Sequence, residues 1–203
     1  MDVSRALADL DEVRSRLAAV QRFRGLSGAA AVWSGIAAVG CGAVQLAVVP
    51  HPATALDGGR YVALWIACLA FALALNYGAL ALWLIRNWSS RTPTELRTAA
   101  IAIAPSVLAG GAFTAALVAR GELGMLPGTW ALCYALGLFA SRTMLPRGTT
   151  TIAFAFAAVG ATLLFAGGTN ALTWWVMPLT FGCGQIAIGV LIERDAAAMK
   201  VTA

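Results

Sequence analysis

The residues of this chain best suited to chemistry are its four cysteines, which occupy four different apolar segments: Cys41, Cys68, Cys133 and Cys183. At about 1.5 Å of rise per helical residue, helices that begin at a common surface would place these thiols at a similar depth. Four thiols at one level could bind a soft cation such as Cu(I) or Zn(II). The sequence has no Cys-x-x-Cys pair and only one histidine, which favours the alternative that these are small packing residues. We therefore expect no metal and no other cofactor.

Acid–base groups are scarce in the connections on the side of the chain that carries few basic residues. His51, Asp57 and Glu122 are the only candidates there. A membrane enzyme would need these three side chains within hydrogen-bonding distance of one another. Nothing in their spacing brings them together, so the sequence favours a protein that is not an enzyme.

Four uncharged polar residues interrupt the apolar segments and are the candidate ligand-binding residues: Gln45, Asn76, Thr180 and Gln185. Asn and Gln are costly in lipid without partners, so we expect these amides to face the interior of a helical bundle. There they could line a site for a neutral, lipidic or apolar ligand. The alternative is that they pair in a dry core, which would count against such a site.

The last apolar segment has the most irregular composition. It contains Pro178, followed by Gly182 and Gly184, and this predicts a kink or a freed carbonyl between residues 176 and 184. The segment is therefore the best candidate for a functional helix. The alternative is a bent helix that serves only packing.

Helices must position these residues, because six long stretches contain no charged residue and no histidine. They run over about 26–49, 61–85, 98–119, 125–141, 149–168 and 171–192. Each could cross roughly 30 Å of hydrocarbon as a helix. The 203 residues are 60% hydrophobic and 11% charged, whereas soluble domains contain about 25% charged residues. The sequence therefore predicts an all-α polytopic membrane protein, with a six-transmembrane-helix bundle over residues 25–194 and a cytoplasmic tail over 195–203.

Basic residues predict the orientation of this bundle. If the N-terminus is cytoplasmic, all but Arg60 and Arg120 of the 14 lysines and arginines lie on the cytoplasmic side. The positive-inside rule then predicts that both termini are cytoplasmic. The Ala-, Gly- and Arg-rich composition suits a bacterium, in which we expect the bundle to lie in the inner membrane. The net charge of +5 is explained by this topology and by contact with membrane lipid, so we expect no nucleic-acid partner.

The first 24 residues predict a cytoplasmic amphipathic helix that precedes the bundle. One apolar stripe recurs at heptad-like spacing and is the candidate partner-binding surface, formed by Val3, Leu10, Val13, Leu17 and Val20, with Ala6 between the first two. Such a helix could lie in the headgroup layer or on its own bundle. It could instead self-associate, or bind a cytoplasmic protein partner.

Small residues recur every four positions within the apolar segments. Examples are Ala70, Ala74 and Gly78 in the second segment. Because lipid tails give no hydrophobic drive between helices, close packing in membranes depends on such stripes. Together they predict a compact bundle rather than a wide pore.

Several short segments resemble a family of small six-span inner-membrane proteins of bacteria to which no biochemical activity is assigned. The likeness is carried by residues 22–25 (RFRG), 125–130 (MLPGTW), 136–141 (LGLFAS), 145–146 (LP) and 181–185 (FGCGQ). The resemblance implies a six-span fold and an inner-membrane location. It implies no catalytic residue.

Two functions from different classes are consistent with these patterns. The first is a non-enzymatic membrane protein that acts by association, as an accessory, scaffold or sensor-like subunit. The alternative is a transporter or binding protein for a neutral, lipidic or apolar ligand. A cavity lined by the amides of Gln45, Asn76 and Gln185 would favour the alternative.

Overall fold

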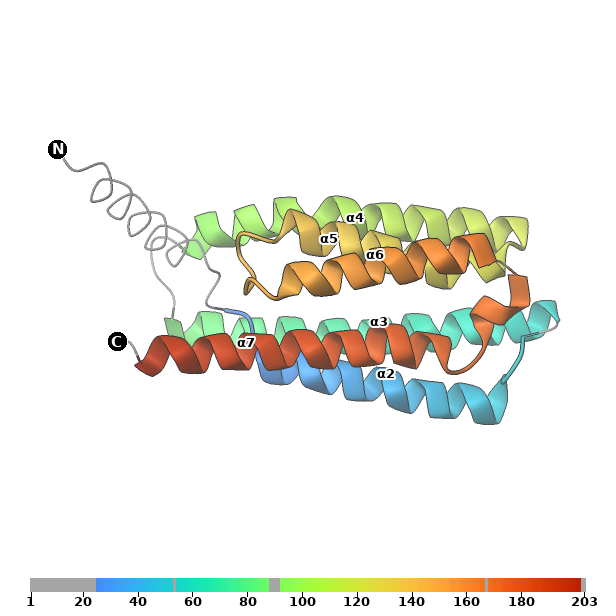
Figure 1. The fold of residues 1–203 in the computed structure, drawn as a ribbon, viewed down its shortest axis with the longest axis horizontal. Helices are drawn as coiled ribbons and strands as arrows, with labels where there is room; N and C mark the ends of the chain where they lie inside the picture. The colour runs from blue at the N-terminus through green and yellow to red at the C-terminus, as the bar shows by residue number, and fades with distance from the viewer. Residues whose placement is uncertain (1–24, 53, 88–91, 167, 202–203) are drawn as a thin grey trace.

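The computed structural model describes residues 25–52, 54–87, 92–166 and 168–201 of the chain, and within these ranges every regular element is helical. Two 3₁₀ turns, η1 (Leu123–Met125) and η2 (Gly168–Leu172), and a π-helical turn, η3 (Pro178–Gly182), connect or precede the α-helices. The α-helices are α2 (Gly28–Val48), α3 (Ala55–Asn87), α4 (Thr92–Arg120), α5 (Leu126–Ala140), α6 (Thr149–Ala166) and α7 (Cys183–Val201) (Figure 1).

The helices have the length and composition of a membrane bundle. Within the described residues, five helical segments are long and apolar enough to cross a membrane: α2, α3, Leu96–Arg120, Leu123–Ala140 and α6. The remaining helix, α7, follows the η3 turn and packs along α2. The chain is therefore an all-helical protein with five to six apolar helices.

The six helices form two layers of three. In the first layer α2 packs against both α3 and α7, and in the second α5 packs against both α4 and α6 (Figure 1). The layers meet where α6 contacts α7 and where η1 contacts η2. Neighbouring helices within a layer are antiparallel, so each layer buries its contacts along most of the length of its central helix.

Glycines bring the backbones of α2 and α7 into direct contact. Gly28 and Gly35 of α2 are seven residues apart and face Gly189 and Gly182. A Cβ atom built at Gly35 would lie 2.6 Å from the carbonyl oxygen of Gly182, and one at Gly189 would lie 2.6 Å from that of Gly28. Only glycine allows this approach, which places helices close enough for van der Waals contact between main chains.

The same kind of contact joins α5 to α6. A Cβ atom at Gly128 would lie 2.8 Å from the carbonyl oxygen of Gly160, and one at Gly160 would lie 2.9 Å from that of Gly128. Each layer therefore contains one helix pair that is held together by paired glycines.

Aromatic rings, rather than glycines alone, fill the contact between the layers. The ring centroid of Tyr134 on α5 lies 4.8 Å from that of Phe156 on α6 and 5.7 Å from that of Phe181 in η3. The centroids of Phe156 and Phe181 are 5.3 Å apart. A Cβ atom at Gly184 would collide with the Phe156 ring, so α7 approaches the second layer through a ring edge.

Compact packing does not extend to the second half of α3, where the prediction from small residues is wrong. Ala70, Ala74 and Gly78 are exposed, and a Cβ atom at Gly78 would have no neighbour within 4 Å. The reason is the direction in which these residues face, because α3 still runs beside α2 at this level, where Asn76 donates to Ser34. The buried residues of α3 all lie between Gly58 and Cys68.

The irregularity predicted around Pro178 is confirmed. Residues 178–182 form the π-helical turn η3 directly before α7. In this turn the N–H of Cys183 donates to the carbonyl oxygen of Pro178, five residues earlier. A Cβ atom at Gly42 would collide with the Pro178 ring, so the turn packs directly on α2.

Three helices project beyond the rest of the bundle at one end. The last turns of α3 and α7 and the first turns of α4 extend past the α5–α6 connection and past the start of α2 (Figure 1). We call this the basic end, because it carries Arg86, Arg97, Arg142, Arg147 and Arg194, all exposed. Residues 195–201 of the predicted tail are part of this projection, since α7 continues to Val201.

Candidate functional site

Gln45 forms a buried hydrogen-bonding centre that links three segments of the first layer. Its side chain is 0% exposed. The Nε2 group donates to the carbonyl oxygen of Leu172 in η2 at 2.7 Å, and Oε1 accepts from the indole N–H of Trp65 on α3 at 2.9 Å. Both ends of the amide are thereby used in holding α2, α3 and η2 together.

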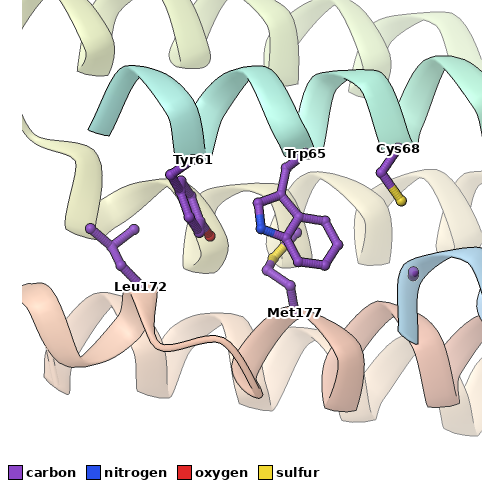
Figure 2. Packing of buried hydrophobic residues seen from close by; sticks show 6 residues of the cluster. Tyr61, Trp65, Cys68, Leu172 and Met177 are labelled. Atoms are coloured by element: carbon purple, nitrogen blue, oxygen red, sulfur yellow. The ribbon is translucent and has the colours of Figure 1, made fainter. Parts of the chain in front are cut away.

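An apolar cluster surrounds this centre near the end of the bundle opposite the basic end. Figure 2 shows Tyr61 and Trp65 projecting from α3 toward Leu172 and Met177. The Tyr61 and Trp65 ring centroids are 6.5 Å apart. The Tyr61 hydroxyl is buried and has no hydrogen-bond partner in the described part of the chain. The cluster is thus a packed core that leaves one polar atom unsatisfied.

The other predicted ligand-binding residues lie at separate places. Asn76 donates from Nδ2 to the hydroxyl of Ser34 on α2 at 2.8 Å and to a carbonyl oxygen of its own helix. Gln185 donates to the hydroxyl of Tyr134 on α5 at 2.8 Å. Thr180 donates to a carbonyl oxygen within its own helical segment at 2.8 Å.

These amides therefore act as cross-links between helices. They pair with Trp65, Ser34 and Tyr134 rather than with one another, and they do not converge on one site. Each bond joins two different helices, as expected for polar side chains in a membrane interior. This arrangement counts against a common ligand site formed by them.

The structure brings two of the four cysteines together. Cys41 and Cys68 lie next to each other across the α2–α3 interface. Cys133 instead packs against α4, where a Cβ atom at Gly110 would lie 3.8 Å from its Sγ, and Cys183 is exposed on α7. All four are free thiols. Among the described residues, no three His, Cys, Asp or Glu side chains are grouped so that they could hold a metal ion.

Asp57 caps the start of α3. The Thr54 hydroxyl donates to Asp57 Oδ2 at 2.8 Å, and the Asp57 N–H donates back to that hydroxyl at 3.2 Å. This reciprocal pair is a helix cap, and Arg60 lies 3.7 Å from the same carboxylate. In the described ranges Asp57 bonds with neither His51 nor Glu122, which counts against the catalytic set considered from the sequence.

Glu193 forms a hydrogen bond between two helices that the sequence did not reveal. Its carboxylate on α7 accepts from the backbone N–H of Ala29 in the first turn of α2 at 3.0 Å. The hydroxyl of Ser27 caps the same helix by accepting from the N–H of Ala30 at 3.2 Å. An acidic group at a helix N-terminus is favourable for the helix dipole, so this contact joins α2 and α7 at the basic end.

Known proteins give no assignment for this chain. No protein-family model matches it, and neither a curated protein nor a solved structure is significantly similar to it. The resemblance carried by its short segments therefore stays a prediction. The apolar stripe predicted between Val3 and Val20 lies outside the described residues.

Proposed function

We propose that this protein is a six-span protein of a bacterial inner membrane, with both termini in the cytoplasm, that acts by association with another protein or with its own copies. In this role it is an accessory, scaffold or sensor-like subunit and not an enzyme. The observation that carries the proposal is the projection of three helices at the basic end. Arginines concentrate at the cytoplasmic side of membrane proteins, which supports this orientation.

Helix length supports a cytoplasmic platform at this end. At about 1.5 Å per residue, the 33 residues of α3 extend about 50 Å, whereas a hydrocarbon core is about 30 Å thick. Part of the excess projects on the same side as the ends of α4 and α7, and the rest extends past α2 at the opposite end (Figure 1). The predicted amphipathic helix over residues 3–23 would join them and provide an apolar stripe for a partner.

The interior of the bundle supports association over transport. The amides of Gln45, Asn76 and Gln185 each bond to another helix and leave no common polar lining for a solute. No specific contact in the described residues favours a path for a neutral or apolar ligand.

The proposal is tested by purifying the full chain from its membrane in nanodiscs and identifying by mass spectrometry what remains bound. We expect a stoichiometric protein partner or a defined homo-oligomer. The double variant L10D/L17D should lose it, because it places two charges in the apolar stripe. The matched control S4D/S15D adds the same charges on the opposite side of the predicted helix and should retain it. A monomer without a partner, or equal loss in both variants, would refute the proposal.

A further inference from the structure

Two neighbouring polar side chains of α3 have hydrogen-bonding atoms without a partner in the part of the chain that the structure describes. Asn76 donates through Nδ2 to Ser34 and to the carbonyl oxygen of Ala72, but no described group donates to its Oδ1 atom. Tyr77 is 61% exposed, and its hydroxyl forms no hydrogen bond with a described residue. One acceptor and one donor therefore remain unused side by side.

Both groups lie deep in the hydrocarbon core in the membrane arrangement proposed above. Asn76 comes ten residues, or about 15 Å of helix, before Arg86, and this is half the thickness of a core of about 30 Å. Hydroxyls in the apolar helices commonly donate to their own main chain, as Thr114 does to Gly110 at 2.7 Å. An amide oxygen and a hydroxyl that face lipid without partners are costly, so a further protein surface is needed to satisfy them.

An exposed apolar face of α3 adjoins these two groups. Ile66, Leu69 and Leu73 are 48%, 57% and 40% exposed. Together with Asn76 and Leu80 they recur at intervals of three, four, three and four residues, which is the spacing found in helices that pack in pairs. Within the described ranges α2 is the only helix that packs along α3, and most of this face lies outside that contact.

The face is complementary to a second copy of itself. All copies have one orientation in a membrane, so two α3 helices related by a twofold axis run parallel. In a parallel pair, residues at one edge of the contact meet residues at the opposite edge of the partner helix. Asn76 and Tyr77 are about 100° apart around the helix and lie at opposite edges of the row that contains Leu69 and Leu73. The Tyr77 hydroxyl of each copy can therefore donate to Asn76 Oδ1 of the other.

We propose that two copies of this protein associate within the membrane through one face of α3, formed by Ile66, Leu69, Leu73, Asn76, Tyr77 and Leu80. Two symmetric Tyr77–Asn76 hydrogen bonds satisfy the unused groups, and the aliphatic side chains pack between them. A second copy supplies both the donor and the acceptor at the required depth. This dimer requires the membrane location of the proposed function, but it does not use the apolar stripe between Val3 and Val20.

The test measures dimer formation by fluorescence energy transfer between full-length copies that carry donor or acceptor labels at the C-terminus. The copies are reconstituted together in vesicles of phosphatidylethanolamine and phosphatidylglycerol at a series of protein-to-lipid ratios. L69A/L73A should weaken the dimer more than about tenfold, because it removes packing atoms from the contact. The matched control L82A/I85A truncates two exposed side chains on another side of α3 and should weaken it less than about twofold.

The hydrogen bonds are tested by Y77F, which removes only the hydroxyl. This variant should weaken the dimer about eightfold, since each of the two lost bonds contributes about threefold in a membrane. F71L changes an exposed ring on another side of α3 and should leave dimer formation unchanged. Because all these side chains are exposed in one copy, the helix content measured by circular dichroism should be the same in every variant.

A monomer at every protein-to-lipid ratio, equal losses in the two double variants, or undiminished dimer formation by Y77F would each overturn the proposal. L10D/L17D should retain the dimer, because its charges lie outside the membrane. Loss of the dimer in L10D/L17D but not in L69A/L73A would overturn the α3 contact and support association through the apolar stripe. A monomer that still retains another protein in nanodiscs would likewise overturn the α3 contact and leave the proposed function standing.

Discussion

The helix α7 contacts its two neighbours in different ways. Toward α2 it presents Gly189, and the preceding η3 turn presents Gly182, so that main-chain atoms touch at both glycines. Toward the second layer it presents Gly184 to the ring of Phe156, while the adjoining η3 turn adds Phe181 to the same aromatic group. Main-chain atoms cannot move without moving the helix, whereas a ring can rotate into a neighbouring rotamer. We therefore expect the α2–α7 pair to behave as one rigid unit and the interface between layers to tolerate change.

The strongest test of this difference is a large side chain in the α2–α7 contact. G35L should destabilise the protein by about 3 kcal/mol or prevent folding, because overpacking against main chain cannot be relieved by rotamer changes. Thermal unfolding in detergent, followed by circular dichroism, measures the loss. G40L is the matched control on the same helix, since a Cβ atom there would have no neighbour within 4 Å, and it should be nearly neutral. Similar losses of stability in both variants would show that the close main-chain contact at Gly35 does not determine the stability of the helix pair.

A second test asks whether a polar bond can fix helices as firmly as paired glycines. Q45L should cost about 2 kcal/mol, because the indole N–H of Trp65 and the carbonyl oxygen of Leu172 would remain buried without their partner. N76L removes an amide whose bond to Ser34 lies at an exposed residue, so it should cost less than about 1 kcal/mol. Thermal unfolding of both variants measures the two losses. A lower unfolding temperature for N76L than for Q45L would contradict this ranking.

A larger side chain in the contact between the layers should reduce the stability less. G184A should cost about 1 kcal/mol, because the added methyl group meets the far edge of the Phe156 ring, which can move. Adding F156L to this variant should recover part of the loss, and a double-mutant cycle on the unfolding free energies measures the coupling. A loss as large as that of G35L would mean that this interface is as rigid as the α2–α7 contact.

We expect the smallest change in stability at the edge of the first layer, where α3 packs on α2. Mild oxidation with diamide should cross-link Cys41 to Cys68 with little change in unfolding temperature, because the two residues lie next to each other across the α2–α3 interface. Peptide mass spectrometry without reduction identifies the pair. Cys133 and Cys183 serve as internal controls and should stay unlinked within one chain. A cross-link from Cys183 instead would show that α7 lies elsewhere.

The sequence predicted the helices better than their contacts. Charge-free stretches located the helices because hydrocarbon admits no unpaired charge over its whole thickness. The search for small residues every four positions did not select Gly28 and Gly35, whose spacing of seven brings α2 against α7 and η3. Composition alone does not tell which face of an apolar helix meets a neighbour and which meets lipid, so the exposed half of α3 was not foreseen.

The candidate site was predictable only in part. That Gln45 and Gln185 face inward follows from the cost of an unpaired amide in lipid, but their partners Trp65 and Tyr134 depend on how the layers pack. Depth along a helix placed the four cysteines at one level but gave no information on their direction.

The bond from Glu193 to the first turn of α2 has a consequence for whatever binds the two terminal segments of the chain. It fixes the point where the first 24 residues join the bundle beside the last turns of α7. Two short segments anchored side by side meet each other at an effective concentration on the order of millimolar. A partner held by one of them would thus reach the other without a second diffusional encounter. Weak contacts at each would add up to avid binding.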